Sequence, residues 1–340
     1  MARVRRGGHK PPTMNDVAAL AGVSQSTVSF VVNDRPGARI GEATRKRVLE
    51  AVEELGFRTD LTARALKTGQ TLTIGMLTDR IASTPFGGRI IVGAQEAAWQ
   101  RDVLVLLADT GDDDNVQAAA VNALLDRRVD GLLFSAQSTG LVELPVSAPT
   151  PTVLVNCFDE AGTPSVIPDE EFGGGLAMRA VLDAGHTNVL YLAGEPDRWA
   201  TAERIRGMAQ AARAAGVTMG ISYGGYDTDS GYERMIEIAR GELPTAVLCA
   251  SDRVALGVML ALSELSLRCP EDISVVGYDN QEYLAEVLHP ALTTVELPFL
   301  DLGRRGVEQM FALAAGKKVD PQVKIRGRLV RRDSLARPRG

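Results

Sequence analysis

From about residue 71 onward, short apolar runs alternate with amphipathic stretches of helical length, and this alternation constrains the fold more than any other feature of the chain. The runs that predict strands are TLTIGML (71–77), VLVLLA (103–108), GLLF (131–134), TVLV (152–155), NVLYLA (188–193), AVLCA (246–250) and ISVVG (273–277). Among the stretches that predict helices are 87–100, 114–127, 171–184, 202–215 and 252–264. Strands that alternate with helices form parallel sheets covered on both faces. The roughly 270 residues of this region suit two such sheets.

The charge of the first 70 residues differs from that of the rest. They hold 12 Lys and Arg against 7 Asp and Glu, a net charge of +5, whereas the remaining chain holds 25 against 36, a net charge of −11. This split indicates that only the N-terminal part meets a polyanion, although a solvated basic tail gives much the same count.

The segment TMNDVAALAGVSQSTVSFVVND (13–34) has the pattern of two short helices joined by a glycine turn. Thr13 and Asp16 have the spacing of a capping box, and Gly22 breaks the first helix. Ser24 can cap the second helix, which turns its valines inward and keeps polar residues near its outer, N-terminal side. A third helix is expected over 42–55, between two glycines. A polar-faced second helix after such a turn suits the major groove of DNA; an ordinary helical hairpin is the alternative.

Residues 59–70 (TDLTARALKTGQ) link this segment to the rest of the chain. Asp60 can cap a helix of roughly two turns, which is too short to be stable alone in water. The helix would be stabilised if the hinge helices of two chains pair with each other over DNA. A flexible linker whose leucine docks on the body is the alternative.

Several other classes of protein are disfavoured. Nothing reads as a secretion signal or a membrane span. The three cysteines and three histidines have neither paired nor metal-ligand spacing, so we expect a reduced cytoplasmic protein without a metal or cofactor. No G-x-G-x-x-G after a strand, G-x-x-x-x-G-K-[ST], G-x-S-x-G or H-E-x-x-H motif points to an enzyme. A binding protein that only senses sugars would leave the helix-turn-helix pattern unexplained.

With these motifs the sequence resembles the lactose/galactose repressor family of transcription regulators. The family opens with a pattern close to T-x-x-D-V-A-x-x-A-G-V-S-x-x-T-V-S-x-V-x-N, which residues 13–33 match. Later matches are R-x-x-G (Arg204, Gly207), SDRVALG (251–257), GYDN (277–280), HPALTTVELP (289–298) followed by LG (302–303), and LVRRDS (329–334). The resemblance implies an all-α helix-turn-helix head and an α/β two-lobed body, built like periplasmic binding proteins from two doubly wound parallel sheets.

The resemblance also implies a division of the chain. We expect a basic tail (1–12), a helix-turn-helix domain (13–58), a hinge helix (59–70) and an effector-binding and dimerisation domain (71–340). Within the last, the N-lobe would hold about 71–168 and 298–325, and the C-lobe about 169–297 and 326–340. Three crossovers would join the lobes near 168–172, 296–299 and 325–330.

A role in binding a pseudo-palindromic double-stranded DNA operator is implied for the head and the hinge. Gln25 and Ser26 would read base edges. The residues expected mostly to position phosphates are Thr13, Ser24, Thr27, Ser29 and Asn33. Phe30 stands where many members carry a guanine-reading Arg, and it offers only apolar contact. In the hinge, Leu66 would be a wedge in the minor groove, lined by Ala63, Arg64 and Lys67. Thr59-Asp60 stands where family members often have Asn-Pro, so the geometry with which the chain enters the hinge helix departs from the family pattern.

The implied effector lies between the lobes. Arg204 would hold two hydroxyls or a carboxylate, Asp252 would accept from ligand donors, and Tyr226 would stack on the ligand ring. The remaining candidates are Asn156, which stands where many members have Asp, and Phe86, Asp79 and Trp199. Aromatic faces with bidentate polar groups suit a sugar. The alternatives are a surface ion pair for Arg204, a helix cap for Asp252, and core packing for the aromatics.

Together these features predict a cytoplasmic, nucleoid-associated bacterial homodimer. It would repress carbohydrate-metabolism genes, and a small ligand would control its operator affinity. The sequence leaves open whether the effector is a sugar, a sugar phosphate or a purine. It also leaves open whether the effector induces or corepresses, and whether two or four chains assemble.

Overall fold

The computed structural model describes residues 12–32, 40–58, 69–80, 87–111, 113–144 and 149–339. The chain divides into two compact units, residues 1–71 and 72–340. Among the residues singled out above, those outside the described ranges are Asn33, Thr59, Asp60, Ala63, Arg64, Leu66, Lys67 and Phe86.

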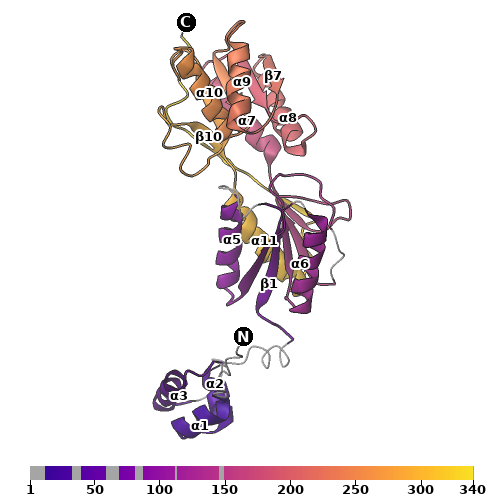
Figure 1. The fold of residues 1–340 in the computed structure, drawn as a ribbon, viewed down its shortest axis with the longest axis vertical. Helices are drawn as coiled ribbons and strands as arrows, with labels where there is room; N and C mark the ends of the chain where they lie inside the picture. The colour runs from indigo at the N-terminus through magenta and orange to yellow at the C-terminus, as the bar shows by residue number, and fades with distance from the viewer. Residues whose placement is uncertain are drawn as a thin grey trace, which may run out of the picture. The chain divides into compact units, whose positions relative to one another are not determined.

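The described residues of the first unit form the helices α1 (Met14–Ala21), α2 (Gln25–Val32) and α3 (Glu42–Leu55) (Figure 1). The predicted capping box is confirmed, because Asp16 N donates to Thr13 Oγ1 at 3.4 Å and Thr13 N donates to Asp16 Oδ2 at 2.7 Å. Gly22 ends α1 in the left-handed region, at φ 64°. One valine from each helix is fully buried in the shared core: Val17, Val28 and Val48.

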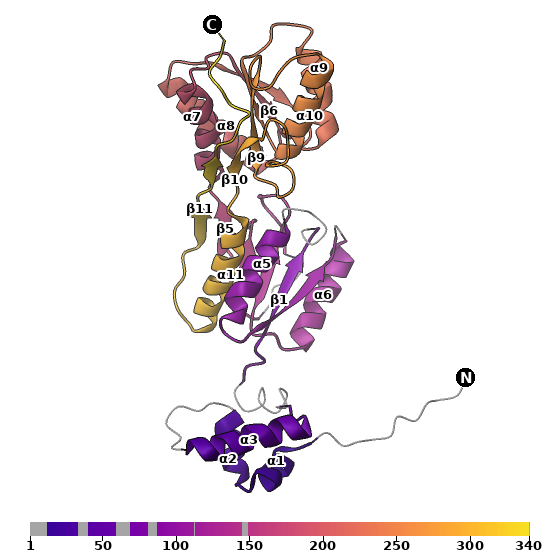
Figure 2. The same cartoon turned by 90° about the vertical axis from the view of Figure 1, so that its left-hand side faces the viewer.

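The second unit contains two six-stranded sheets, and the first sheet has the order β11-β5-β4-β3-β1-β2. Its strands, all paired in parallel, are β1 (Thr73–Thr78), β2 (Leu104–Asp109), β3 (Leu132–Ser135), β4 (Thr152–Val155), β5 (Ser165–Pro168) and β11 (Gln322–Ile325). Helices α5 (Gly88–Trp99) and α11 (Phe299–Ala314) pack together over one face (Figure 2). Helix α6 (Asp114–Asp126) covers the other face.

The second sheet has the order β12-β10-β9-β8-β6-β7. Its strands are β6 (Val189–Ala193), β7 (Met219–Tyr223), β8 (Ala246–Cys249), β9 (Ser274–Asp279), β10 (Thr293–Glu296) and β12 (Arg328–Val330). Strand β12 runs antiparallel to β10, which departs from the expected all-parallel sheet, while the other pairs are parallel. Its helices pair as α7 (Glu170–Asp183) with α8 (Trp199–Ala214), and α9 (Thr228–Ile238) with α10 (Asp252–Glu264).

The chain passes between the two sheets three times, from β5 to α7, from β10 to α11 and from β11 to β12. We call the half with the first sheet the N-lobe and the half with the second sheet the C-lobe. Within the described residues, no helix is long and apolar enough to cross a membrane.

Glycines allow three helix pairs to touch backbone to backbone. A Cβ at Gly207 of α8 would lie 1.8 Å from the carbonyl oxygen of Glu171, and one at Gly174 of α7 would lie 2.2 Å from that of Arg204. The same reciprocal contact joins the other two pairs, through Gly93 with Gly303 and Gly231 with Gly257. Three of the six glycines, at 207, 257 and 303, lie in the motifs recognised in the sequence, so a packing requirement explains their positions.

Candidate functional site

Helix α2 presents the N-terminal residues predicted to meet DNA. Gln25 and Ser26 are exposed, and 38% of the Phe30 surface is accessible. Ser24 caps the helix by accepting from Thr27 N at 3.2 Å, and its hydroxyl also lies 2.8 Å from those of Ser26 and Thr27. The cap therefore fixes the first turn, from which side chains can reach bases or phosphates.

In the second unit, the carboxyl edges of the two sheets face each other. The Phe158 ring, just after β4, meets the Trp199 ring, at the start of α8, edge to face at 5.3 Å. Arg89 of α5 donates to Glu282, shortly after β9, at 3.1 Å. Each contact joins segments that follow strands of different sheets. Ligands of doubly wound sheets bind at this edge, so a site between the lobes can use both.

Arg204 is buried in the C-lobe, which excludes the surface ion pair considered above. Its Nε and Nη2 donate to the two carboxylate oxygens of Glu170, each at 2.8 Å, and its Nη1 donates to the Ala250 carbonyl at 2.8 Å. The guanidinium lies 3.7 Å from the Tyr278 ring centroid, and the Tyr278 hydroxyl also donates to Glu170. Burial alone would lower the pKa of Arg204, but the Glu170 carboxylate raises it well above the usual value.

Asp252 has no exposed surface. Its two carboxylate oxygens accept from Thr294 Oγ1 at 2.6 Å and from Gln281 N at 2.7 Å. Burial raises its pKa to about 6. Ser251, which accepts from Val254 N, caps α10, so the capping alternative for Asp252 does not hold. Through its bond from Gln281 N, Asp252 positions the segment after β9. A direct contact between Asp252 and the effector stays a prediction.

Asp279, the last residue of β9, is a candidate that the sequence reasoning did not single out, although it lies in the recognised GYDN motif. It is half-buried and has a positive φ of 108°. Such backbone conformations are costly for non-glycine residues and cluster at functional sites. Burial raises the pKa of its carboxyl well above the usual range, against the lowering effect of Arg204. Asp279 therefore offers a carboxyl group at the edge of the C-lobe sheet.

The structure places two aromatic candidates, Tyr226 and Trp199, in the same lobe as Arg204. The Tyr226 hydroxyl lies 2.6 Å from Thr201 Oγ1, and the Tyr226 ring covers Gly194 at the end of β6. Trp199 is half-buried between Phe158 and Lys324, whose Nζ lies 5.7 Å from the indole ring. Of these two aromatic residues, Trp199 is the one that contacts the N-lobe, through Phe158.

Two predicted residues lie at the edge of the N-lobe sheet. Asn156, at φ 61°, accepts from Thr139 Oγ1 at 2.7 Å and donates to the Ala136 and Gln137 carbonyls at 2.8 and 3.3 Å. Its side chain thus clamps the segment after β3. Asp79 accepts from Gln137 N, with distances of 2.9 and 3.0 Å to its two oxygens.

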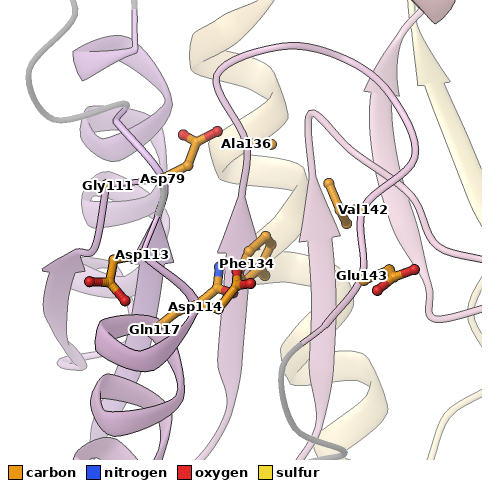
Figure 3. A pocket seen from close by; sticks show the side chains of 9 residues that line it. All are labelled: Asp79, Gly111, Asp113, Asp114, Gln117, Phe134, Ala136, Val142 and Glu143. Carbon is orange, nitrogen blue, oxygen red and sulfur yellow. The ribbon is translucent and has the colours of Figure 1, made fainter.

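Asp79 also lines a pocket of about 310 Å³ on the α6 side of the N-lobe. Figure 3 shows it near the end of its strand, with Asp113 and Asp114 on the α6 side and Glu143 across the pocket. The lining is acidic. In the part of the chain that the structure describes, no group of three or more His, Cys, Asp or Glu residues is arranged to hold a metal ion.

A small head with a helix-turn-helix and a two-lobed α/β body define a class of DNA-binding regulators with a ligand-binding domain. Residues 13–60 match the family described as bacterial regulatory proteins, lacI family, and residues 178–335 match the periplasmic binding protein-like domain. The HTH-type transcriptional repressor PurR of Vibrio vulnificus is 36% identical over 332 residues, which cover 95% of this chain and 98% of that protein. The chain belongs to the lacI family of transcriptional repressors, which are regulators and not enzymes.

Other relatives and structures agree with this membership. The ribose operon repressor of Escherichia coli is 35% identical over 305 residues, covering 87% of this chain and 91% of the relative. The Lac repressor dimer bound to operator and the anti-inducer ONPF superposes with a TM-score of 0.78 at 29% identity, covering 96% of this chain and 100% of that one. The CelR–cellobiose complex gives a TM-score of 0.67 at 29% identity, covering 95% and 99%.

Proposed function

We propose that the protein is a dimeric repressor of the bacterial cytoplasm that binds a pseudo-palindromic operator and is controlled by a sugar bound between its lobes. One observation carries the ligand part of this proposal. At the facing carboxyl edges of the two sheets, Phe158 of the N-lobe contacts Trp199 of the C-lobe, the lobe that also holds Arg204 and Asp279. Aromatic faces beside a carboxylate suit the alternating apolar and hydroxyl surfaces of a sugar.

Exposed apolar side chains on the N-lobe support dimerisation. Val92 and Trp99 of α5 are 45% and 74% exposed, and Leu104 and Leu107 of the neighbouring edge strand β2 are 52% and 42% exposed. Isolated exposed apolar residues are ordinary, but several on adjacent elements favour an interface. A dimer also matches an operator whose half-sites repeat about one DNA turn apart.

The head would contact DNA as the family resemblance implies. Gln25 and Ser26 lie exposed at the start of α2, where side chains of a recognition helix reach base edges. Thr13, Ser24, Thr27, Ser29 and Asn33 would position phosphates, and Leu66 would wedge the minor groove with Ala63, Arg64 and Lys67 beside it. Phe30 would contact a thymine methyl.

Among the effector candidates, Asp279 joins Arg204, Trp199 and Tyr226 in the C-lobe, with Asp79, Phe86 and Asn156 from the N-lobe. The names of the relatives do not agree on one ligand, since one is the HTH-type transcriptional repressor PurR and another the ribose operon repressor. The CelR structure holds cellobiose. A ligand that prefers one lobe arrangement would change operator affinity by its differential binding, typically ~1–3 kcal/mol.

The test combines selection and ligand screening. An operator is first selected from random duplex DNA with the full-length protein. Sugars and purines are then screened for a saturable change in melting temperature and in operator affinity. A sugar that does both supports the proposal, and a purine that does so in its place overturns the sugar assignment. If no selected DNA is bound in preference to random DNA, the operator proposal fails.

A further inference from the structure

We infer that Glu170 makes the effector site reject anions, so that the effector is an uncharged ligand and not a phosphorylated or carboxylated one. This inference rests on the proposed function, because it concerns the same site. It assigns to Glu170 a role in ligand specificity through its control of Arg204.

The first argument is that Glu170 already uses the arginine that an anion would need. Arginine binds carboxylates and phosphates through a fork of parallel N–H bonds. In Arg204 the Nε and Nη2 side of that fork is engaged by both oxygens of Glu170, and Nη1 donates to a backbone carbonyl. The side chains of Arg204 and Glu170 are 6% and 1% exposed, so water does not screen the pair. An anionic ligand would have to displace a buried carboxylate.

The second argument is that the surrounding backbone is built to keep Glu170 in place. Gly174 and Gly207 let the first turns of α7 approach α8 at the level of Arg204. A Cβ at Gly173 would lie 2.0 Å from the Tyr278 hydroxyl, which donates to Glu170 at 2.8 Å. Two residues of the triple glycine of α7, which matches no phosphate-binding motif, therefore make room for the partners of Glu170: Gly173 for Tyr278 and Gly174 for Arg204.

The third argument is the charge around the pair. Arg204 is paired with Glu170, and burial and the carboxyl groups of Asp252 and Glu170 all act to raise the pKa of Asp279, so a negative charge at this position is already disfavoured. Acidic residues also follow other strands at the facing edges, namely Asp79, Asp109, Asp159, Glu195, Asp227 and Glu282. Of the arginines near these edges, Arg89 and Arg198 pair with Glu282 and Glu195. The field at this edge disfavours an anion, whereas Asp279 can accept from the hydroxyl or N–H groups of a neutral ligand.

The experiment uses inorganic phosphate as the anionic probe. Melting temperatures of the full-length wild type, Glu170→Gln and Glu171→Gln are measured as phosphate replaces chloride at constant ionic strength. Glu171→Gln is the matched control, because Glu171 is the next residue of α7 and its side chain forms an ion pair with Arg206, at 3.6 Å, instead of with Arg204. Glutamine keeps the size of Glu170 and its hydrogen-bond acceptor but removes the charge. We expect Glu170→Gln alone to gain a saturable stabilisation, with an apparent phosphate affinity at least about tenfold tighter than that of the wild type.

Binding of phosphate to the basic head must be separated from binding at the site. The gain should disappear when Arg204→Met is added to Glu170→Gln. No gain in Glu170→Gln, or a gain that persists without Arg204, overturns the inference.

If Glu170→Gln does not fold, the wild type is compared with Arg204→Lys across phosphate, citrate and a sugar phosphate. If any of these anions stabilises the wild type and the effect depends on Arg204, the inference is overturned. If no anion stabilises the wild type in this way, the inference is supported. The outcome is separate from that of the proposed function, because it involves neither the operator nor an identified effector.

Discussion

Phe158 and Trp199 meet edge to face at 5.3 Å, with the first ring in the N-lobe and the second in the C-lobe. Aromatic pairs of this geometry add about 0.5–1.5 kcal/mol beyond the area they bury. The contact is thus strong enough to favour one lobe arrangement and weak enough for a ligand to replace it.

This contact can be followed by fluorescence. The chain has two tryptophans, so Trp99→Phe leaves Trp199 as the only indole. In that background we expect Phe158→Ala to shift the emission to longer wavelength, because water gains access to the ring. Phe311→Ala, which removes a ring on α11, serves as the control and should leave the emission unchanged. An unchanged spectrum in Phe158→Ala would rule out the lobe contact in solution.

Base preference should respond to the start of α2. Replacing Gln25 or Ser26 by Ala should change the preferred base at one operator position and cost ~1–3 kcal/mol per lost contact. Affinity for a random duplex of equal length should stay constant, because phosphate contacts dominate it. Repeated operator selection with each variant checks this, and identical selected sequences would contradict the assignment.

The hinge gives a separate prediction, made from the sequence because Leu66 lies outside the described residues. Leu66→Ala should weaken the specific complex at least about tenfold while leaving non-specific binding almost unchanged. Gel-shift affinity and DNA bending are the measurements. A variant with the affinity and bend of the wild type would show that Leu66 is no wedge.

Helix contact through glycine predicts a large stability difference between two similar substitutions. Gly207→Ala places a Cβ 1.8 Å from the Glu171 carbonyl, so we expect a loss of about 1–3 kcal/mol in urea unfolding. Gly88→Ala, at a helical position with no atom within 4 Å of the added Cβ, should stay within about 0.5 kcal/mol of the wild type. Equal losses would mean that α7 and α8 are less closely packed than described.

His186 predicts a pH dependence of stability. Its ring nitrogens lie 2.9 Å from Thr245 Oγ1 and 2.8 Å from the Ala336 carbonyl, and burial lowers its pKa from the usual 6.5. Below pH 6.5 the unfolded chain therefore binds a proton at this residue more readily than the folded one, so the His186 contribution to the free energy of unfolding falls as the pH falls. The raised pKa of Asp252, about 6, acts in the opposite direction in this range. In urea titrations from pH 7.5 to 5, His186→Gln should therefore be more stable relative to the wild type at pH 5 than at pH 7.5. The exposed His289 provides the control, and a His289→Gln variant should keep the pH dependence of the wild type.

The sequence predicted the central strands and the helices beside them, because buried strands and amphipathic helices leave clear periodicities. It did not predict five strands, β5, β7, β10, β11 and β12. In β7 the residues are mostly exposed at the sheet edge, and in β10 two threonines precede the only apolar residue. Helices α9 and α11 were missed as well. Helix α11 contains Gly303 and Gly306, which the sequence alone does not favour in a helix but which the packing against Ile90 and Val155 requires.

For the site, the motif around Arg204 directed attention to the right part of the C-lobe. Its partner Glu170 is 34 residues away in sequence, and no local pattern connects the two. Asp279 was visible as part of GYDN after a predicted strand, but its positive φ could be known only from the structure. Asp252 was recognised as a motif residue, but the sequence did not show that its carboxyl accepts hydrogen bonds from Thr294 and from the Gln281 amide inside the C-lobe.

The reciprocal glycine contacts also restrict how this protein can diverge. Most core positions can change during evolution, because substitution of a neighbouring residue by a smaller or larger one restores the packing. At Gly174 and Gly207 the opposing atoms are main-chain carbonyls, which are the same in every residue, so no second substitution can compensate for an added methyl group. New specificities must therefore arise in the loops at the sheet edges, while the crossing that positions Arg204 stays constant.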